Sequence, residues 1–120
     1  EVLKSLVLNN ASSDENMLVF TTHSPYSLAI INTMIMGAKA YANANEELRN
    51  QIKSILPVKY QIKDDDIAAY RLSSSDAIYC QSVINPNTGL VFKNELDSAS
   101  DDIMRVFNSL YQCYAKTLAK

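Results

Sequence analysis

The feature that most constrains this chain is the stretch 17–26, where an apolar run passes through Thr-Thr-His-Ser-Pro into a second apolar segment. Met17–Phe20 are continuously apolar rather than alternating, which is typical of a strand covered on both faces in a parallel sheet. Ser24 can cap a helix, and Pro25 fits the first turn because no hydrogen bond is lost there. The sequence therefore predicts a short buried strand that leads into a helix through a loop carrying His23. Ligands of open α/β sheets bind outside the carboxyl ends of strands, which makes His23 a candidate functional residue.

Helices are predicted on both sides of this strand. Residues 2–10 have helical spacing, and the segment 25–41 is apolar nearly all round, so that helix is either deeply buried or covered by a partner. A more polar helix is expected over 46–56, with apolar residues on one side and Pro57 as its stop.

In the second half of the chain the spacing of apolar residues changes from a helical pattern to the alternation that is typical of strands. Alternation over 58–62 allows a strand, and 67–72 and 77–84 are better strands, joined by a loop short enough for a hairpin. The segment 85–89, Asn-Pro-Asn-Thr-Gly, predicts a turn, and 90–92 a further short strand. A last helix is expected over 101–118 with Ser100 as its cap. Its expected buried stripe is Ile103, Val106, Phe107, Leu110, Tyr114 and Leu118.

Composition narrows the function classes. The net charge is -2 and the basic residues are scattered, which argues against a nucleic-acid surface built by this segment alone. No apolar run reaches the roughly 20 residues of a membrane-spanning helix, and no signal peptide is visible. Cys80 and Cys113 lack metal-ligand spacing and are expected to be reduced thiols in a cytoplasmic protein. The acidic run Asp64–Asp66 is expected to be a solvated turn, so no metal site is predicted.

The chain is expected to be a single α/β region, mixed α+β as a fragment. It begins without methionine and in the middle of a helical pattern, so we expect a piece of a longer protein. Within it, 1–56 is predicted as helix, strand, helix and helix, and 57–120 as a β-hairpin followed by a helix.

The order of strand, Thr-Thr-His-Ser-Pro-Tyr and apolar helix resembles the switch-histidine segment, or H-loop, of ABC-type ATPases related to chromosome-maintenance and DNA-repair proteins. This branch is often described as AAA-type or abortive-infection ATPases. The order of elements in 67–118 resembles the C-terminal end of such proteins. The resemblance implies that the chain is the C-terminal part of a P-loop NTPase lobe, in which His23 contacts the γ-phosphate of ATP. It also implies that Thr21, Thr22, Ser24 and Pro25 set the geometry of the loop.

The same resemblance implies what this chain lacks. There is no phosphate-binding loop of the Gly-x-x-x-x-Gly-Lys-Ser/Thr type, and Gly37 and Gly89 are the only glycines. ATP and Mg²⁺ are therefore expected only in the full-length protein, and the fragment is expected to be inactive alone. The implied partners are a missing N-terminal ATPase lobe, a second subunit in a homodimer, and DNA or a defence-system protein.

Two other interpretations stay open. A lone histidine at a strand end more often hydrogen-bonds the backbone than serves catalysis. The second alternative is a non-enzymatic protein–protein interaction module, in which the apolar helix 25–41 packs against a partner.

Overall fold

The computed structural model describes residues 5–6, 15–22, 24–72, 79–92 and 101–118. They form a mixed α+β fold with helices α2 (Pro25–Asn43), α3 (Glu46–Ile55) and α4 (Asp101–Leu118), and an antiparallel pair of strands, β1 (Tyr70–Leu72) and β2 (Cys80–Ser82). Two short 3-10 helices, η1 (Val58–Tyr60) and η2 (Asp64–Asp66), connect α3 to β1. The α+β class is confirmed. Of the predicted helix 2–10, only residues 5–6 are described, and they are helical.

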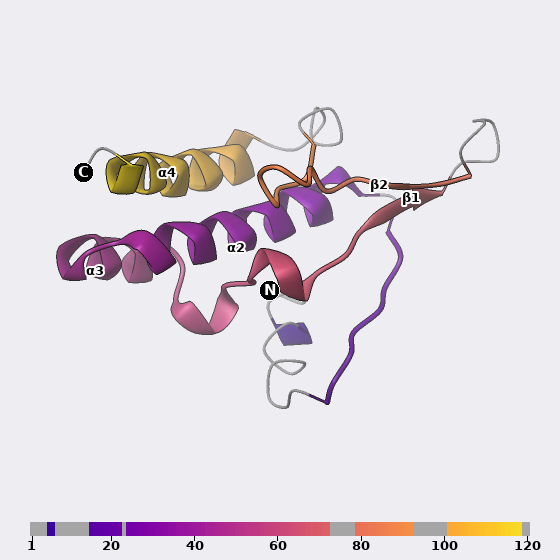
Figure 1. The fold of residues 1–120 in the computed structure, drawn as a ribbon, viewed down its shortest axis with the longest axis horizontal. Coiled ribbons are helices and arrows are strands. Elements are labelled where there is room, and N and C mark those ends of the chain that lie inside the picture. Colours follow the sequence, from indigo (N-terminus) through magenta and orange to yellow (C-terminus); the bar gives the residue numbers. More distant parts are fainter. Residues whose placement is uncertain (1–4, 7–14, 23, 73–78, 93–100, 119–120) are drawn as a thin grey trace.

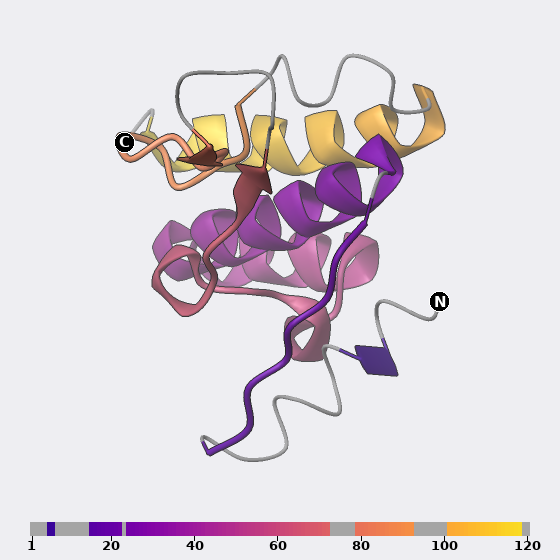
Figure 2. The same cartoon turned by 90° about the vertical axis from the view of Figure 1, so that its right-hand side faces the viewer.

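Helix α2 is the centre of the fold. Figure 2 shows it between α4 on one side and α3 on the other, and it contacts both helices. The predicted helix 25–41 is confirmed and extends to Asn43, where Ala44 caps it by donating its N–H to the Tyr41 carbonyl at 3.3 Å. Half of its apolar side chains are buried, namely Ala29, Ile31, Met34, Ile35, Met36 and Ala40. The all-round apolar pattern thus reflects a helix covered by its own chain.

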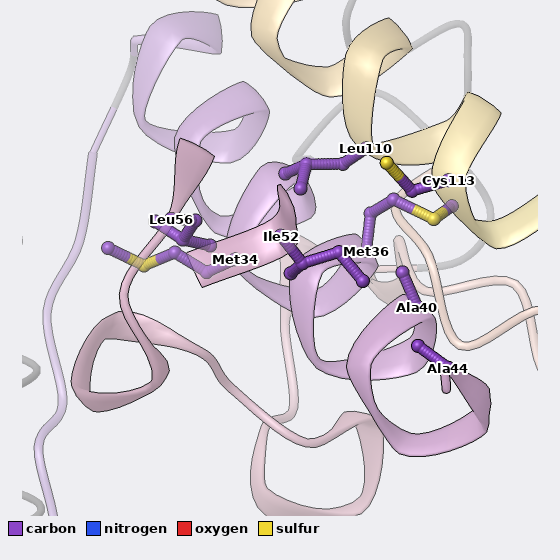
Figure 3. Close-up of a cluster of buried hydrophobic side chains, with 8 residues drawn as sticks. All are labelled: Met34, Met36, Ala40, Ala44, Ile52, Leu56, Leu110 and Cys113. Carbon is purple, nitrogen blue, oxygen red and sulfur yellow. The ribbon is translucent and has the colours of Figure 1, made fainter. Parts of the chain in front are cut away.

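The main core is the cluster drawn in Figure 3, where side chains of α2, α3 and α4 meet. Its members are Met34, Met36, Ala40, Ala44, Ile52, Leu56, Leu110 and Cys113. Gly37 allows the backbone of α2 to approach the end of α3, because a Cβ there would lie 2.6 Å from Cδ2 of Leu56. A side chain at position 37 would therefore have to displace the end of the Leu56 side chain.

Helix α3 has the predicted N-terminus and ends near the predicted position. Asn45 caps it, accepting the Leu48 N–H at 2.9 Å, and Glu46 and Glu47 lie in the first turn, where the helix dipole favours negative charge. The helix ends at Ile55, one residue before the predicted end, with Leu56 as its C-cap and Pro57 next.

The predicted strand over 58–62 is wrong. The chain makes a single 3-10 turn there, in which Tyr60 donates its N–H to the Pro57 carbonyl at 3.0 Å. Tyr60 and Ile62 pack against the main core, and the Ile62 N–H donates to the Met34 carbonyl of α2 at 3.2 Å. The alternating pattern therefore comes from anchoring a loop on α2, and no strand among the described residues pairs with this segment.

The predicted hairpin is present but short. Strands β1 and β2 cover only part of 67–72 and 77–84, with Arg71 opposite Gln81, and the predicted loop lies outside the described residues. The turn over 85–89 is confirmed: Gly89 donates its N–H to the Asn85 carbonyl at 2.8 Å and has a φ of 72°. The segment 90–92 returns beside the end of β2 through a single antiparallel bridge between Ile84 and Val91.

A buried polar side chain ties this returning segment to the central helix. Asn32 of α2 is 3% exposed, and its Oδ1 accepts the Val91 N–H at 2.8 Å. Val91 and Ala29 form a second, small buried cluster beside this bond. The bond satisfies a buried backbone donor where α2 and the returning segment pack together.

Helix α4 has the predicted bounds, but its buried stripe differs from the prediction. Leu110 is fully buried and Phe107 and Tyr114 pack against the core, whereas Val106 and Leu118 are exposed. Cys113 and Thr117 are buried instead, so the buried face is rotated from the predicted one. Ile103 and the expected cap Ser100 lie outside the residues whose side chains are described.

The predicted buried strand Met17–Phe20 is wrong. These residues run as extended chain without strand pairing, and Met17 and Val19 are 85% and 79% exposed. Figure 1 shows this segment running away from the helices rather than between them. A continuously apolar segment indicates that its burial would be favourable, but the pattern does not indicate which polypeptide buries it.

Candidate functional site

The segment that carries the predicted site residues leads directly into α2. Thr22 Oγ1 accepts the Ser24 N–H at 3.0 Å, and Ser24 Oγ accepts the Tyr26 N–H at 3.3 Å. Ser24 is the N-cap of α2 and Pro25 its first residue, so the predicted helix start is confirmed. Thr21 and Thr22 are exposed on extended chain, and His23 lies outside the described residues.

The described residues do not fit ATP with Mg²⁺. Gly37 lies in the middle of α2 against Leu56, and Gly89 lies in the tight turn before residue 90, close to Asp64. Neither glycine belongs to a loop that precedes a helix, which a phosphate cradle requires. The expectation that ATP would need another part of a larger protein remains a prediction.

Metal ligands do not gather in the part of the chain that the structure describes. Searched over those residues, no group of three or more His, Cys, Asp or Glu side chains could hold an ion. Asp64–Asp66 form η2 and are exposed, as expected for solvated charges. Cys80 is exposed and Cys113 is buried, and both are free.

A cavity of about 610 Å³ lies between the end of α2, the loops around η1 and η2, and Tyr114 of α4. Lys39 at this cavity donates to the Thr88 carbonyl and has its Nζ 5.6 Å from the centre of the Tyr114 ring. Lys63, Asp64 and Asp65 also line it, so both signs of charge are present. This mixture selects no ligand charge, and we assign no function to the cavity.

Uncovered apolar side chains gather instead on two extended parts of the chain. The first is the segment Met17–Thr22, which we call the N-terminal arm, where Met17, Val19 and Phe20 are all exposed. The second is the β1–β2 ribbon, where Tyr70 and Leu72 are each 63% exposed and the adjacent Tyr79 is 66% exposed. Large exposed apolar groups in contiguous stretches mark interaction sites more often than singly scattered ones do.

The ribbon has one apolar and one polar face. Directly opposite residues of an antiparallel pair share a face, and successive residues alternate between faces. Tyr70, Leu72 and Cys80 therefore lie on one face together with Ser82, whereas Arg71 and Gln81 lie on the other, where Arg71 Nη2 donates to Gln81 Oε1 at 3.1 Å. In the described chain the apolar face of the ribbon is uncovered.

Sequence reasoning placed strands near both features but missed that they are uncovered. The signal for the ribbon was the alternation Tyr70-Arg71-Leu72 beside Cys80-Gln81-Ser82, which gives one face to apolar residues and one to polar residues. The arm carried no such signal, because Met17–Phe20 are apolar at every position. Among the described residues, no helix is both long and apolar enough to cross a membrane.

Comparison of the chain with protein-family models, with curated proteins and with solved structures found no match.

Proposed function

We propose that this chain is a protein–protein interaction module, and that it docks through the N-terminal arm and the apolar face of the ribbon. The observation that carries this proposal is the exposure of Met17 and Val19, at 85% and 79%, beside a helical core in which Met34, Ile52 and Leu110 are fully buried. Much of helix α2 is buried by α3, α4 and the loop after α3, so we place the docking surface on the extended segments rather than on the helix 25–41 that its sequence suggested.

The energetics support a polypeptide as the partner. Full burial of a side chain such as Met17, Val19 or Leu72 is worth about 1.5–3 kcal/mol each. Association costs an estimated 4–15 kcal/mol in lost freedom, so no single side chain suffices, whereas the arm and the ribbon together are of the right order. A partner that covers several extended residues at once is itself a polypeptide.

Site-specific photo-crosslinking in the producing cells tests this proposal. A benzophenone amino acid at position 19 is expected to give discrete adducts with polypeptide. The same group at position 111 of α4 is the matched control, because Tyr111 is 52% exposed but lies on a helix whose other face is packed. Equal adduct yields at the two positions, or none at position 19, would overturn the proposal.

The switch-histidine hypothesis stays a prediction for His23, with the missing N-terminal ATPase lobe as its implied partner. Isothermal titration of Mg-ATP into the 120-residue chain is expected to show no binding, because the phosphate site would lie elsewhere. In the protein that holds the phosphate site, His23→Ala should retain nucleotide binding and lose turnover by orders of magnitude. Near-normal turnover would return His23 to a structural role.

A further inference from the structure

The outer edge of β1 has backbone groups that are available for pairing. The Val83 N–H donates to the Ala69 carbonyl at 3.1 Å, which makes this opposite pair a hydrogen-bonded one. Such pairs alternate along an antiparallel ladder, so Arg71 also directs its N–H and C=O towards β2. Tyr70 and Leu72 therefore direct theirs away from β2. Neither has a partner for these groups among the described residues.

The edge of β2 differs from the edge of β1, because part of it is already occupied. Ser82 Oγ accepts the Ile84 N–H at 3.3 Å, so a side chain of the strand itself takes up the next outward-facing donor. Edges that natural proteins protect are very short, carry charged side chains or proline, are bulged, or are covered by another element. Strand β1 is short and carries Arg71, whose side chain bonds Gln81 of β2, but it contains no proline and its register is regular. Cys80 and Ser82 also direct backbone groups outward, but segment 90–92 already pairs along the continuation of the β2 edge, where Phe92 donates its N–H to the Val83 carbonyl at 2.9 Å. The outer edge of β1 is therefore the more open of the two.

The N-terminal arm has the properties of a strand that could fill this edge. Met17–Thr21 are already extended, are exposed except for the partly buried Leu18, contain no proline or glycine, and include β-branched and aromatic residues. No backbone partner of these residues is found among the described ones. Their addition to a sheet breaks no contact of the helical core. In its own copy the arm runs away from the ribbon, as Figures 1 and 2 together show.

We propose that the arm of a second copy of this chain adds as a strand to the outer edge of β1, and that the exchange is reciprocal. The inference rests on the proposed function, because it names the partner of the same surface. In a two-fold dimer, each copy receives a strand at its open edge, and its own arm is paired with the other copy. Such a dimer is a closed assembly, because no further copy can add at the same surface. Backbone hydrogen bonds from Tyr70 and Leu72 supply affinity, and alternate side chains of the arm lie beside Tyr70 and Leu72 on the apolar face of the ribbon.

Sedimentation equilibrium over a concentration series tests the pairing. The unmodified chain is expected to form a dimer. Leu72→Pro is expected to raise the dissociation constant of the dimer at least tenfold. Proline at this position removes a donor that faces the partner, whereas the ladder to β2 uses the groups of Arg71. Tyr111→Lys on α4 is the control and should leave the dimer intact. Circular dichroism checks that both variants keep the helical core.

Photo-crosslinking of the purified chain locates the contact. Equal amounts of ¹⁴N and ¹⁵N chains with a benzophenone at position 19 should give mixed-isotope adducts that map to residues 67–72. A chain that stays monomeric, a dimer or larger aggregate insensitive to Leu72→Pro, or adducts that map to α4 would overturn the inference. Adducts with another protein in cells, with a monomeric purified chain, would refute only the second copy as partner. Absence of adducts in both settings would refute the interaction module as well.

Discussion

The helical core and the extended parts of this molecule differ in how far their apolar side chains are covered by the rest of the chain. Ile52 and Leu110 of the core are fully buried, whereas Met17 of the arm is 85% exposed although it is equally apolar. A helix satisfies its backbone hydrogen bonds internally, and its apolar face needs only another helix nearby. An extended segment needs a neighbour for its backbone as well as for its side chains. Each helix buries one face against the others, although Val106 and Leu118 of α4 stay exposed, whereas Met17 and Val19 of the arm gain little cover from the described residues.

Truncation of a core side chain is expected to have the largest effect on stability, and it tests directly the difference between buried and exposed apolar residues. Leu110→Ala is expected to lower the free energy of unfolding by about 2–5 kcal/mol, because it opens a cavity where α4 meets α2 and α3. Leu118→Ala, in the same helix but 68% exposed, is the control and should change it by less than about 0.5 kcal/mol. Urea denaturation of both variants measures the difference. Equal losses would show that α4 does not pack as described.

The bond between the core and the returning segment 90–92 should be the next most costly to lose. Asn32→Ala leaves the buried Val91 N–H without its acceptor and should destabilise the chain by about 1–3 kcal/mol. Exchange of the Val91 amide with deuterium should become faster at the same time. The exposed Asn50 of α3 gives the control Asn50→Ala, for which no loss of stability is expected. An unchanged exchange rate at Val91 in Asn32→Ala would contradict the bond.

A substitution at the junction between the arm and α2 should lower the stability of the chain by less than the two core variants do. Ser24→Ala removes the side chain that accepts the Tyr26 N–H and should cost about 1 kcal/mol of stability. Ser27→Ala, inside α2, should cost nothing because alanine is the better helix former. Thermal unfolding followed by circular dichroism compares the two. If Ser27→Ala proved the more harmful variant, the assigned helix start would be wrong.

The smallest effect is expected in the arm itself. Val19→Ser should change the free energy of unfolding of the isolated chain by less than about 0.5 kcal/mol, because Val19 packs against little. The same variant should weaken self-association measured by sedimentation. A loss above 1 kcal/mol in dilute solution would mean that the arm is covered within its own copy, which would end the contrast between the two regions.

The helices could be predicted closely because their signals are local. Ser24 and Pro25 at the start of α2, Asn45 at the start of α3 and Pro57 after its end act within a few residues of the position they mark. The strands were overestimated, since strand pairing depends on a neighbour that a local pattern cannot name. The alternation over 58–62 turned out to be a loop anchored on α2.

The candidate site was predicted less well than the helices. The sequence placed Thr21, Thr22, Ser24 and Pro25 at the start of an apolar helix, and the described members lie there. The chemical role given to His23 came from a resemblance, and that residue lies outside the described part of the chain. The uncovered arm and ribbon could not be foreseen, because exposure is a property of the assembled elements.

The sequence by itself determined the central helix α2, its cap and its need for cover on nearly every side. It also determined that Met17–Phe20 would gain free energy from burial. Only the tertiary structure decided which of these two apolar segments receives cover from this chain. The hydrophobic effect does not depend on direction, so an apolar pattern predicts that burial is favourable but not which surface provides it. Here α3 and α4 meet that need for α2, and the N-terminal arm remains open to another polypeptide.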